Sequence, residues 1–203
     1  MPPRRSFPIV VLVSLWLAGL LGGFAALQAY AGRPGRVAAP VPAATAWLEA
    51  HRRLGRPLLV MAVHARCPCT DASLAELGDF LARTRGECDA LLLRYSPDPA
   101  AAPRPGETRE LGGVSVPLLA DPDGRLAATL GALTSGSAVL MDAAGQIRFY
   151  GGLTLERGHR GRSPAQDALL VLVADRHTTA LPASPVYGCP LPQVAGYAPE
   201  VCQ

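Results

Sequence analysis

Two cysteines separated by one proline are the residues of this chain best suited to chemistry. Cys67 and Cys69 flank Pro68, directly after the apolar run 57–63 and directly before a stretch with helical periodicity. Thiols that lie where a strand turns into a helix meet free backbone N–H groups and the positive end of the helix dipole, which favour the thiolate. The motif therefore predicts thiol–disulfide exchange or the binding of a soft metal ion.

The spacing of the two thiols also predicts the character of any bond between them. If Pro68 is the first residue of the helix, Cys67 is its N-cap and Cys69 its second residue. Side chains two positions apart on a helix point roughly 200° apart, so the sulfurs could join only through the non-helical cap. Such a disulfide would be strained and easily reduced, which suits an oxidant or isomerase. The competing interpretation is a passive pair of thiols or a stable disulfide.

Charged and imidazole side chains could support these thiols. Arg66 and a protonated His64 lie within three positions of Cys67 and would favour its thiolate. Arg157 could stabilise a thiolate or hold an anionic substrate, or it could be an ordinary surface charge. His64 and His159 facing two or three sulfurs would form a soft-metal set suited to copper.

The remaining cysteines allow several pairings. The chain has five cysteines, so at least one stays unpaired within it. Cys189 and Cys202 lie in a tail rich in proline and glycine, where a disulfide could close a short loop. Alternatively, Cys189 folds back toward Cys67 as a resolving thiol or a third sulfur ligand. Cys88, at the start of an apolar run, suits a buried and inert thiol.

The composition of the chain excludes several classes of protein. The chain has 203 residues, 49% of them hydrophobic, which allows one domain with its own core after an N-terminal apolar segment. The net charge is +3 and no basic cluster is interleaved with aromatic residues, which argues against nucleic-acid binding. All 19 basic residues are arginine. This excludes enzymes that need a P-loop lysine or a Schiff-base lysine.

The N-terminal segment, residues 1–30, predicts export. Arg4 and Arg5 precede the uncharged run 7–30, and about 20 apolar residues suffice to span a bilayer. The arginines should stay inside, which places the domain in the periplasm or exterior, anchored to the cytoplasmic membrane by a single pass. Ala29-Tyr30-Ala31 also has the form of a signal-peptide cleavage site. The length of the apolar run favours an anchor over a cleaved and secreted form.

Local patterns predict the elements that position the thiols. Residues 31–42 are rich in proline and glycine and predict a linker, followed by a domain over 43–203. Ser163 and Gln166 predict a capping box, with Pro164 at N1. We expect strands at 58–63, 90–95 and 116–120, helices at 43–54, 70–85 and 163–176, a helical turn at 126–130, and a hairpin of 138–142 with 146–150. Together these elements predict an α/β domain with a mixed central sheet flanked by helices.

This order of elements resembles the thioredoxin fold, most closely the membrane-anchored thioredoxins of bacteria. A narrower resemblance, over residues 56–191, is to the RedB family of thioredoxin-like proteins. This resemblance slightly favours the alternative in which Cys189 folds back toward Cys67. The matching motifs are His64-x-x-Cys67-Pro68-Cys69, Thr134-Ser135-Gly136, Gly151-Gly152-Leu153-Thr154, Arg157-Gly158-His159 and Tyr187-Gly188-Cys189-Pro190.

Two departures separate the chain from ordinary thioredoxins. Their Cys-x-x-Cys motif is contracted here to Cys67-Pro68-Cys69. Counting back from residues 139–142, Gly136 occupies the place where thioredoxins have a cis-proline facing the active site. A standard thioredoxin reductant is therefore not the expected function.

The leading hypothesis is a thiol–disulfide oxidoreductase without a cofactor, acting on protein thiols or disulfides outside the cytoplasm. Cys67 would attack as the thiolate and Cys69 would resolve the mixed disulfide. The alternative is a copper-binding or metallochaperone module, and its candidate ligands are Cys67, Cys69, His64, His159 and Cys189. A thiol peroxidase and an interaction domain without turnover are further alternatives.

Overall fold

The apolar run after Pro57 forms β1 (Leu58–His64), the central strand of the domain. The computed structural model describes residues 6–175 and 183–192. Every residue of β1 except His64 is buried, because helices or turns cover both faces of the sheet. Since β1 carries the thiol motif at its carboxyl end, the buried central strand of the sheet positions Cys67.

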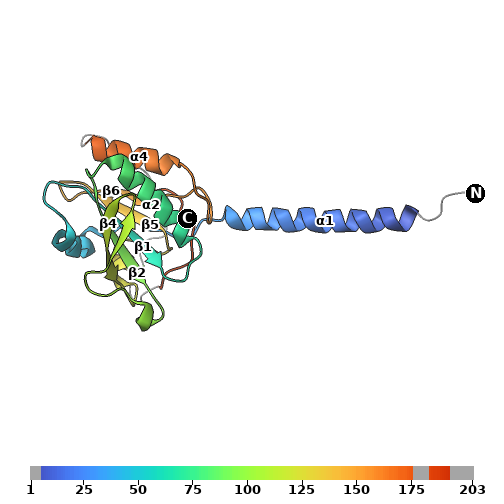
Figure 1. Cartoon of the computed structure of the whole chain (residues 1–203), viewed down its shortest axis with the longest axis horizontal. Coiled ribbons are helices and arrows are strands. Elements are labelled where there is room, and N and C mark those ends of the chain that lie inside the picture. The colour runs from blue at the N-terminus through green and yellow to red at the C-terminus, as the bar shows by residue number, and fades with distance from the viewer. Residues whose placement is uncertain (1–5, 176–182, 193–203) are drawn as a thin grey trace, which may run out of the picture.

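Six strands form one mixed sheet in the order β3-β4-β2-β1-β5-β6 (Figure 1). The central strand β1 pairs in parallel with β2 and antiparallel with β5. β2 pairs in parallel with β4, and two antiparallel pairs, β3 with β4 and β5 with β6, complete the sheet. The bounds are β2 (Asp89–Tyr95), β3 (Thr108–Leu111), β4 (Val114–Ala120), β5 (Ser137–Met141) and β6 (Ile147–Gly151).

Helices cover the two faces of this sheet. α2 (Thr70–Thr84) and α4 (Pro164–Ala174) lie on one face, where Phe80 and Leu169 are fully buried against the strands (Figure 1). The 3-10 helix η1 (Pro42–His51) and the short helix α3 (Arg125–Thr129) lie on the other face. A further 3-10 turn, η2 (Pro99–Ala101), interrupts the proline-rich loop after β2. The predicted mixed sheet flanked by helices is confirmed.

Three elements differ from the prediction. β3 was not predicted, because Thr-Arg-Glu-Leu has three exposed residues and no alternating pattern. It forms because Gly112 and Gly113, both with positive φ, close a tight turn onto β4. The helix predicted at 43–54 is a 3-10 helix that covers Pro42–His51. Only half of the capping box exists, because the Gln166 side chain bonds Glu76 and not the Ser163 backbone.

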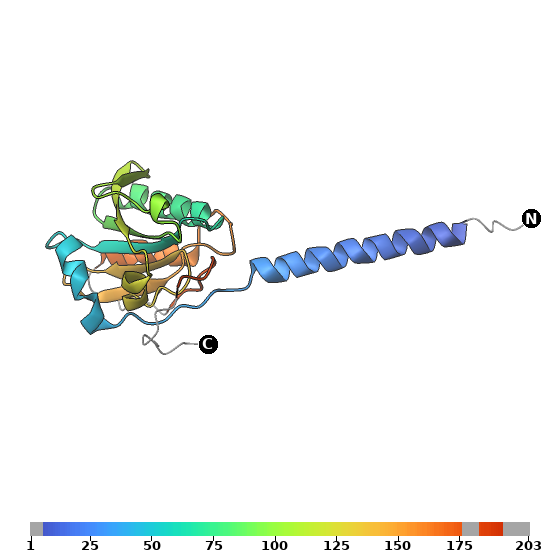
Figure 2. The same cartoon turned by 90° about the horizontal axis from the view of Figure 1, so that it is seen from below.

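The N-terminal helix α1 (Ser6–Ala31) projects away from the domain (Figures 1 and 2). Its segment Pro8–Ala31 is long and apolar enough to cross a membrane, by length and composition. In the structure, no residue in the most apolar stretch of this segment is buried. The segment therefore fits either a membrane anchor or a signal sequence.

The linker after α1 packs along the domain instead of standing free (Figure 2). The Gly35 N–H donates to the Val186 carbonyl at 2.7 Å, and the Ala38 N–H donates to the Gly131 carbonyl at 2.9 Å. Thr134 Oγ1 donates to the carbonyl of Arg36 at 2.7 Å. Because its own backbone groups bond the domain, this stretch fixes where α1 leaves the domain.

Candidate functional site

The thiol motif forms a turn that precedes helix α2. The Cys67 N–H donates to the His64 carbonyl at 3.1 Å, and the Thr70 N–H donates to the Cys67 carbonyl at 3.0 Å. The first helical bond runs from the Ser73 N–H to the Cys69 carbonyl, at 3.3 Å, so Cys69 is the N-cap of α2. The expectation that Cys67 is the N-cap was wrong, because two turn bonds are completed before the helix begins.

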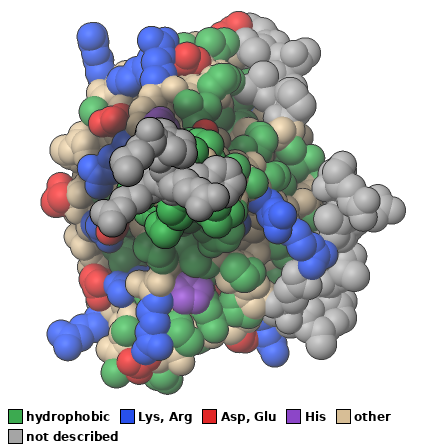
Figure 3. Space-filling model, turned by 90° about the vertical axis from the view of Figure 1, so that its right-hand side faces the viewer, with side chains coloured by type: hydrophobic (Ala, Val, Ile, Leu, Met, Phe, Trp, Pro, Cys, Tyr) green, Lys and Arg blue, Asp and Glu red, His purple; other side chains and the backbone are tan. Residues whose placement is uncertain are grey.

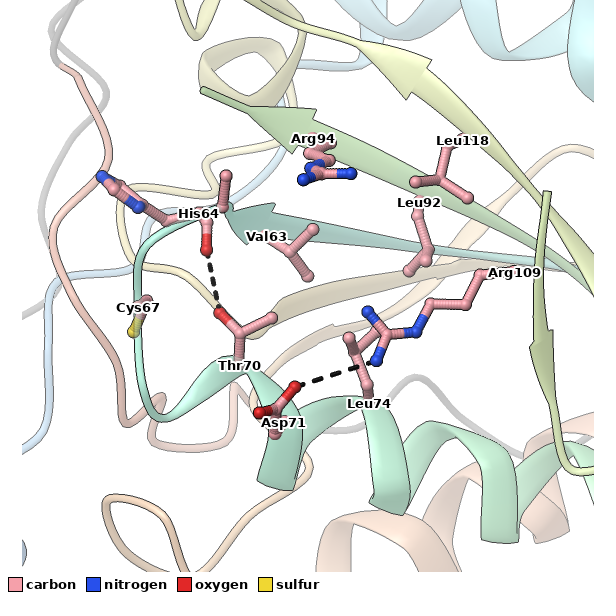
Figure 4. Close-up of a pocket in the computed structure, with 11 residues that line it drawn as sticks. Val63, His64, Cys67, Thr70, Asp71, Leu74, Leu92, Arg94, Arg109 and Leu118 are labelled. Atoms are coloured by element: carbon pink, nitrogen blue, oxygen red, sulfur yellow. Dashed lines mark hydrogen bonds and ion pairs between the residues drawn. The ribbon is translucent and has the colours of Figure 1, made fainter. Parts of the chain in front are cut away.

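Two hydroxyl groups fix this turn to the end of β1. Thr70 Oγ1 donates to the His64 carbonyl at 3.1 Å (Figure 4). Ser135 Oγ accepts from the His64 N–H at 2.9 Å and lies 3.1 Å from Thr70 Oγ1. Neither hydroxyl was predicted as a site residue, although Ser135 belongs to one of the quoted motifs. Their bonds hold the backbone on both sides of Cys67.

The segment around Cys189 lies directly against the thiol turn. The Ser135 N–H donates to the Cys189 carbonyl at 2.8 Å, and the Leu191 N–H donates to the Leu133 carbonyl at 2.9 Å. Gly188 is required there, because a Cβ would overlap the Ser135 carbonyl oxygen. In this register the Cys189 N–H donates to Cys67 Sγ at 3.3 Å. The predicted approach of Cys189 to Cys67 is therefore present, whereas Cys202 lies outside the described residues.

Cys67, Cys69 and Cys189 form a cluster of free thiols around the Cys67 sulfur. Cys67 is 5% exposed, while Cys69 and Cys189 are half-buried. A hydrogen bond from the Cys189 N–H to Cys67 Sγ joins two of them. We call these three residues the thiol cluster.

The three thiols of the thiol cluster differ in pKa. Burial raises the pKa of Cys67, but hydrogen bonds from Cys189, the Cys69 backbone and Thr70 outweigh it, and the pKa lies below its ordinary value. Burial, together with the charge and hydrogen bond of Cys67, raises the pKa of Cys69. The same causes raise the pKa of Cys189 to about 11. Cys67 is therefore the thiol that ionises first.

Arg157 lies beside the other two thiols. Its guanidinium lowers the pKa of both Cys69 and Cys189, although burial and Cys67 dominate their net shifts. It donates to the Gly188 carbonyl, and its Nε atom is buried without a hydrogen-bond partner among the described residues. Arg157 also lies over the Tyr30 ring at the end of α1. Figure 3 looks along α1 toward the face of the domain from which it projects, with the apolar side chains of the helix in the centre of the view.

The other predicted supporting groups do not add positive charge at Cys67. The Arg66 guanidinium pairs with Asp98 at 3.7 Å and is 67% exposed. His64 packs edge-on against Tyr95, and its Nδ1 accepts from the Arg66 N–H at 2.9 Å. Burial lowers the pKa of His64, so its imidazole is neutral at physiological pH.

His159 and Gly136 are the two remaining residues that the sequence predicted to support the thiols. His159 is exposed, and within the described ranges no hydrogen bond or ring contact joins it to the thiol cluster. Gly136 adopts φ +92°, and its N–H donates to the Ala62 carbonyl at 2.8 Å. A Cβ at Gly136 would crowd Ser73 Oγ in the first turn of α2. No cis peptide bond occurs in the described part of the chain.

A pocket of about 120 Å³ opens beside the thiol turn, between β1, α2 and the neighbouring strands (Figure 4). Cys67 and Thr70 line one side of it, while Arg94 and Arg109 enter from β2 and β3. Both arginines are already paired, Arg94 with Glu107 and Arg109 with Asp71, each at 3.8 Å. The pocket thus adjoins Cys67, and the two arginines that line it are both paired.

Solved structures with a similar arrangement of elements are known, at low sequence identity. No protein-family model and no curated protein matches the chain. A hypothetical protein from Sinorhizobium meliloti is similar in structure, at 17% identity and a TM-score of 0.52, over 82% of this chain and 96% of that one. An uncharacterized conserved protein from Geobacillus kaustophilus gives 14% and 0.54, over 82% and 93%. The chain has a thioredoxin-like fold.

A more distant likeness is to a secreted disulfide oxidoreductase of Mycobacterium tuberculosis, homologous to E. coli DsbE. It shares 17% identity at a TM-score of 0.37, over 60% of this chain and 82% of that one.

Proposed function

We propose that this protein is a thiol–disulfide oxidoreductase whose nucleophile is Cys67. The observation that carries the proposal is the environment of its sulfur, which accepts the Cys189 N–H at 3.3 Å in a setting that lowers the pKa of Cys67 despite its burial. Donors aimed at a sulfur stabilise its thiolate, and the thiolate is the attacking species in disulfide exchange. The half-buried Cys69 and Cys189 supply a second thiol within reach.

The reaction needs no cofactor. The Cys67 thiolate attacks one sulfur of a substrate disulfide, forms a mixed disulfide and releases the other substrate sulfur as a thiolate. A second thiol of the thiol cluster then attacks the Cys67 sulfur and releases the remaining substrate thiol. Two electrons pass from the cluster to the substrate, and the reverse sequence oxidises a substrate dithiol.

The proposed setting is the outer side of the cytoplasmic membrane. The apolar helix α1 supports an anchor, and the arginines that precede it in the sequence support an exported domain. The substrates would be protein thiols or disulfides in that compartment. The motif order that resembles the RedB family is consistent with this proposal.

Copper binding is less well supported by the geometry. Within the described residues, no group of three or more His, Cys, Asp or Glu side chains is arranged to hold a metal ion. His159 does not meet the sulfurs, and the ring of His64 packs against Tyr95. We therefore favour disulfide exchange as the function of the thiol cluster.

The test uses the full-length protein in detergent and a disulfide-linked fluorescent peptide. We expect the reduced protein to cleave the peptide, and Cys67→Ser to lose at least tenfold in rate, because no thiolate remains to begin exchange. Cys88→Ser is the matched control, since Cys88 is buried and outside the thiol cluster. Equal rates for Cys67→Ser and the unmodified protein would overturn the proposal.

A further inference from the structure

We propose that Cys189 is the residue that resolves the mixed disulfide on Cys67, so that the disulfide formed in turnover is Cys67–Cys189. This inference rests on the proposed function and replaces the expectation that Cys69 resolves. The observation behind it is a contact between two segments 122 positions apart in sequence, in which the Cys189 N–H points at Cys67 Sγ.

The fold holds Cys189 in this place by main-chain bonds. Ser135 and Leu133 bond the chain at Cys189 and Leu191, and Thr134 forms a β-bridge with Pro190. The same Ser135 bonds the His64 N–H, which belongs to the turn that carries Cys67. The segment 133–135 thus positions both the turn that carries Cys67 and the chain at Cys189, whose N–H lies 3.3 Å from Cys67 Sγ.

Cys69 is less suited to reach the Cys67 sulfur with disulfide geometry. Its backbone is helical, with φ −74° and ψ −15°, and its carbonyl already accepts the first helical bond, from Ser73. Side chains two positions apart on helical backbone do not face each other. The turn cannot easily rearrange, because Pro68 has a fixed φ and Thr70 bonds the His64 carbonyl. A Cys67–Cys69 bridge would strain this turn, whereas a Cys67–Cys189 bridge would join two separate segments that already meet at Cys67 Sγ.

Charge favours Cys189 at the second step. While Cys67 is a thiolate, its charge opposes ionisation of Cys189, and this repulsion ends once Cys67 enters a mixed disulfide. Arg157 then remains beside Cys189 and favours its thiolate. Arg157 acts on Cys69 in the same way, so geometry decides between the two thiols.

Resolution exchanges the mixed disulfide for a disulfide within the protein. Cys67–S–S–R is attacked at the Cys67 sulfur by the Cys189 thiolate, the Cys67–Cys189 bond forms, and RS⁻ leaves. The thiol proton of Cys189 passes to solvent, and the released RS⁻ takes a proton from solvent. Both cysteines end oxidised, and the substrate disulfide ends as two thiols.

Peptide mapping tests the identity of the disulfide. Full-length protein that carries Cys88→Ser and Cys202→Ser is oxidised with glutathione disulfide, alkylated, and cleaved at arginine. Cleavage yields the peptide 67–83, which contains Cys67 and Cys69, and the peptide 177–203, which contains Cys189. We expect these peptides to be joined with Cys69 alkylated, and the link to persist in Cys69→Ser. An internal disulfide within 67–83 and an alkylated Cys189 would overturn the inference.

Kinetics separate this inference from the proposed function. We expect Cys189→Ser to accumulate the mixed disulfide on Cys67 and to slow thiol release by at least about tenfold, because the resolving thiolate is gone. Cys69→Ser should not accumulate the mixed disulfide, because Cys189 remains to resolve it. Cys189→Ser keeps the backbone N–H that bonds Cys67 Sγ. Circular dichroism checks that both variants are folded. If Cys67→Ser abolishes exchange but Cys69→Ser accumulates the mixed disulfide instead, only the inference fails.

Discussion

The guanidinium of Arg157 lies over the ring of Tyr30, with Cζ 4.9 Å from the ring centroid. The Arg157 N–H also donates to the Ala31 carbonyl at 3.1 Å, and the guanidinium donates to the Gly188 carbonyl beside Cys189. One side chain therefore joins the end of the apolar helix α1 to the thiol cluster. The thiols lie on the side of the domain where α1 leaves it.

Removing the charge of Arg157 should slow the second step of exchange. Arg157→Met keeps a long side chain but removes the cation that favours the thiolates of Cys69 and Cys189. We expect thiol release from the mixed disulfide to slow on the order of tenfold at neutral pH, because the rate follows the thiolate fraction. Raising the pH should restore the rate, which a purely structural defect would not permit. Arg160→Met, at an exposed neighbouring position, is the control and should change little.

Oxidation should stabilise the folded protein strongly. A Cys67–Cys189 disulfide joins residues 122 positions apart, and the chain-entropy estimate for a loop of about 100 residues is about 4–5 kcal/mol. We expect the midpoint of thermal unfolding to rise by roughly 10 °C on oxidation. Differential scanning fluorimetry on oxidised and reduced protein measures the shift. The rise should survive in Cys69→Ser and vanish in Cys189→Ser, and the opposite pattern would contradict the assignment.

A methyl group at position 188 should displace Cys189 from Cys67. Gly188→Ala places a Cβ against the Ser135 carbonyl oxygen, which is backbone and cannot move aside. We expect a loss of about 1–3 kcal/mol in the free energy of unfolding and a higher pKa of Cys67, because its hydrogen bonds from Cys189 lengthen. Chemical denaturation and the pH dependence of alkylation measure the two effects. Gly32→Ala is the control, since its nearest contact is ordinary; equal behaviour of both variants would refute the packing argument.

The local pattern of the sequence predicted the central elements correctly, because they bury side chains at regular spacing. β1, α2 and the hairpin of β5 and β6 lie close to their predicted bounds. Contacts between distant segments were harder to predict. Nothing local to Glu76 indicates that its buried carboxylate accepts the Gly161 N–H at 2.5 Å, and the hairpin of β3 depends on two glycines.

The same holds for the candidate site, where local motifs were predicted and contacts between distant segments were harder to predict. Cys67 and Cys69 were evident from the motif, whereas for Cys189 the sequence left open a pairing with Cys202 or an approach to Cys67. The helix start was misplaced by two residues, because hydrogen bonds to Thr70 and Ser135 decide the turn. Arg66 was expected to act on Cys67, yet it pairs with Asp98, a residue in another loop. Charge partners set by tertiary contacts cannot be read from spacing along the chain.

Cys88 should make the protein sensitive to alkaline pH. Burial raises the pKa of Cys88 to about 12 from an ordinary value of 9.0. Between these two values the unfolded chain loses a proton that the folded chain keeps, so stability falls as pH rises, by about 1.4 kcal/mol per pH unit. We expect Cys88→Ala to flatten the pH dependence of denaturant unfolding between pH 9 and about 12. A slope unchanged by this substitution would show that Cys88 is not the group responsible.

The most direct test of the nucleophile is the pH dependence of alkylation at Cys67 and Cys69 in the reduced full-length protein. Both thiols lie in the arginine-cleaved peptide 67–83, so mass spectrometry compares them within one sample. Because the pKa of Cys67 is lowered and that of Cys69 is raised, we expect Cys67 to react first, with a midpoint below the ordinary cysteine value. Earlier alkylation of Cys69, or a Cys67 midpoint above the ordinary value, would contradict the assignment of Cys67 as the nucleophile.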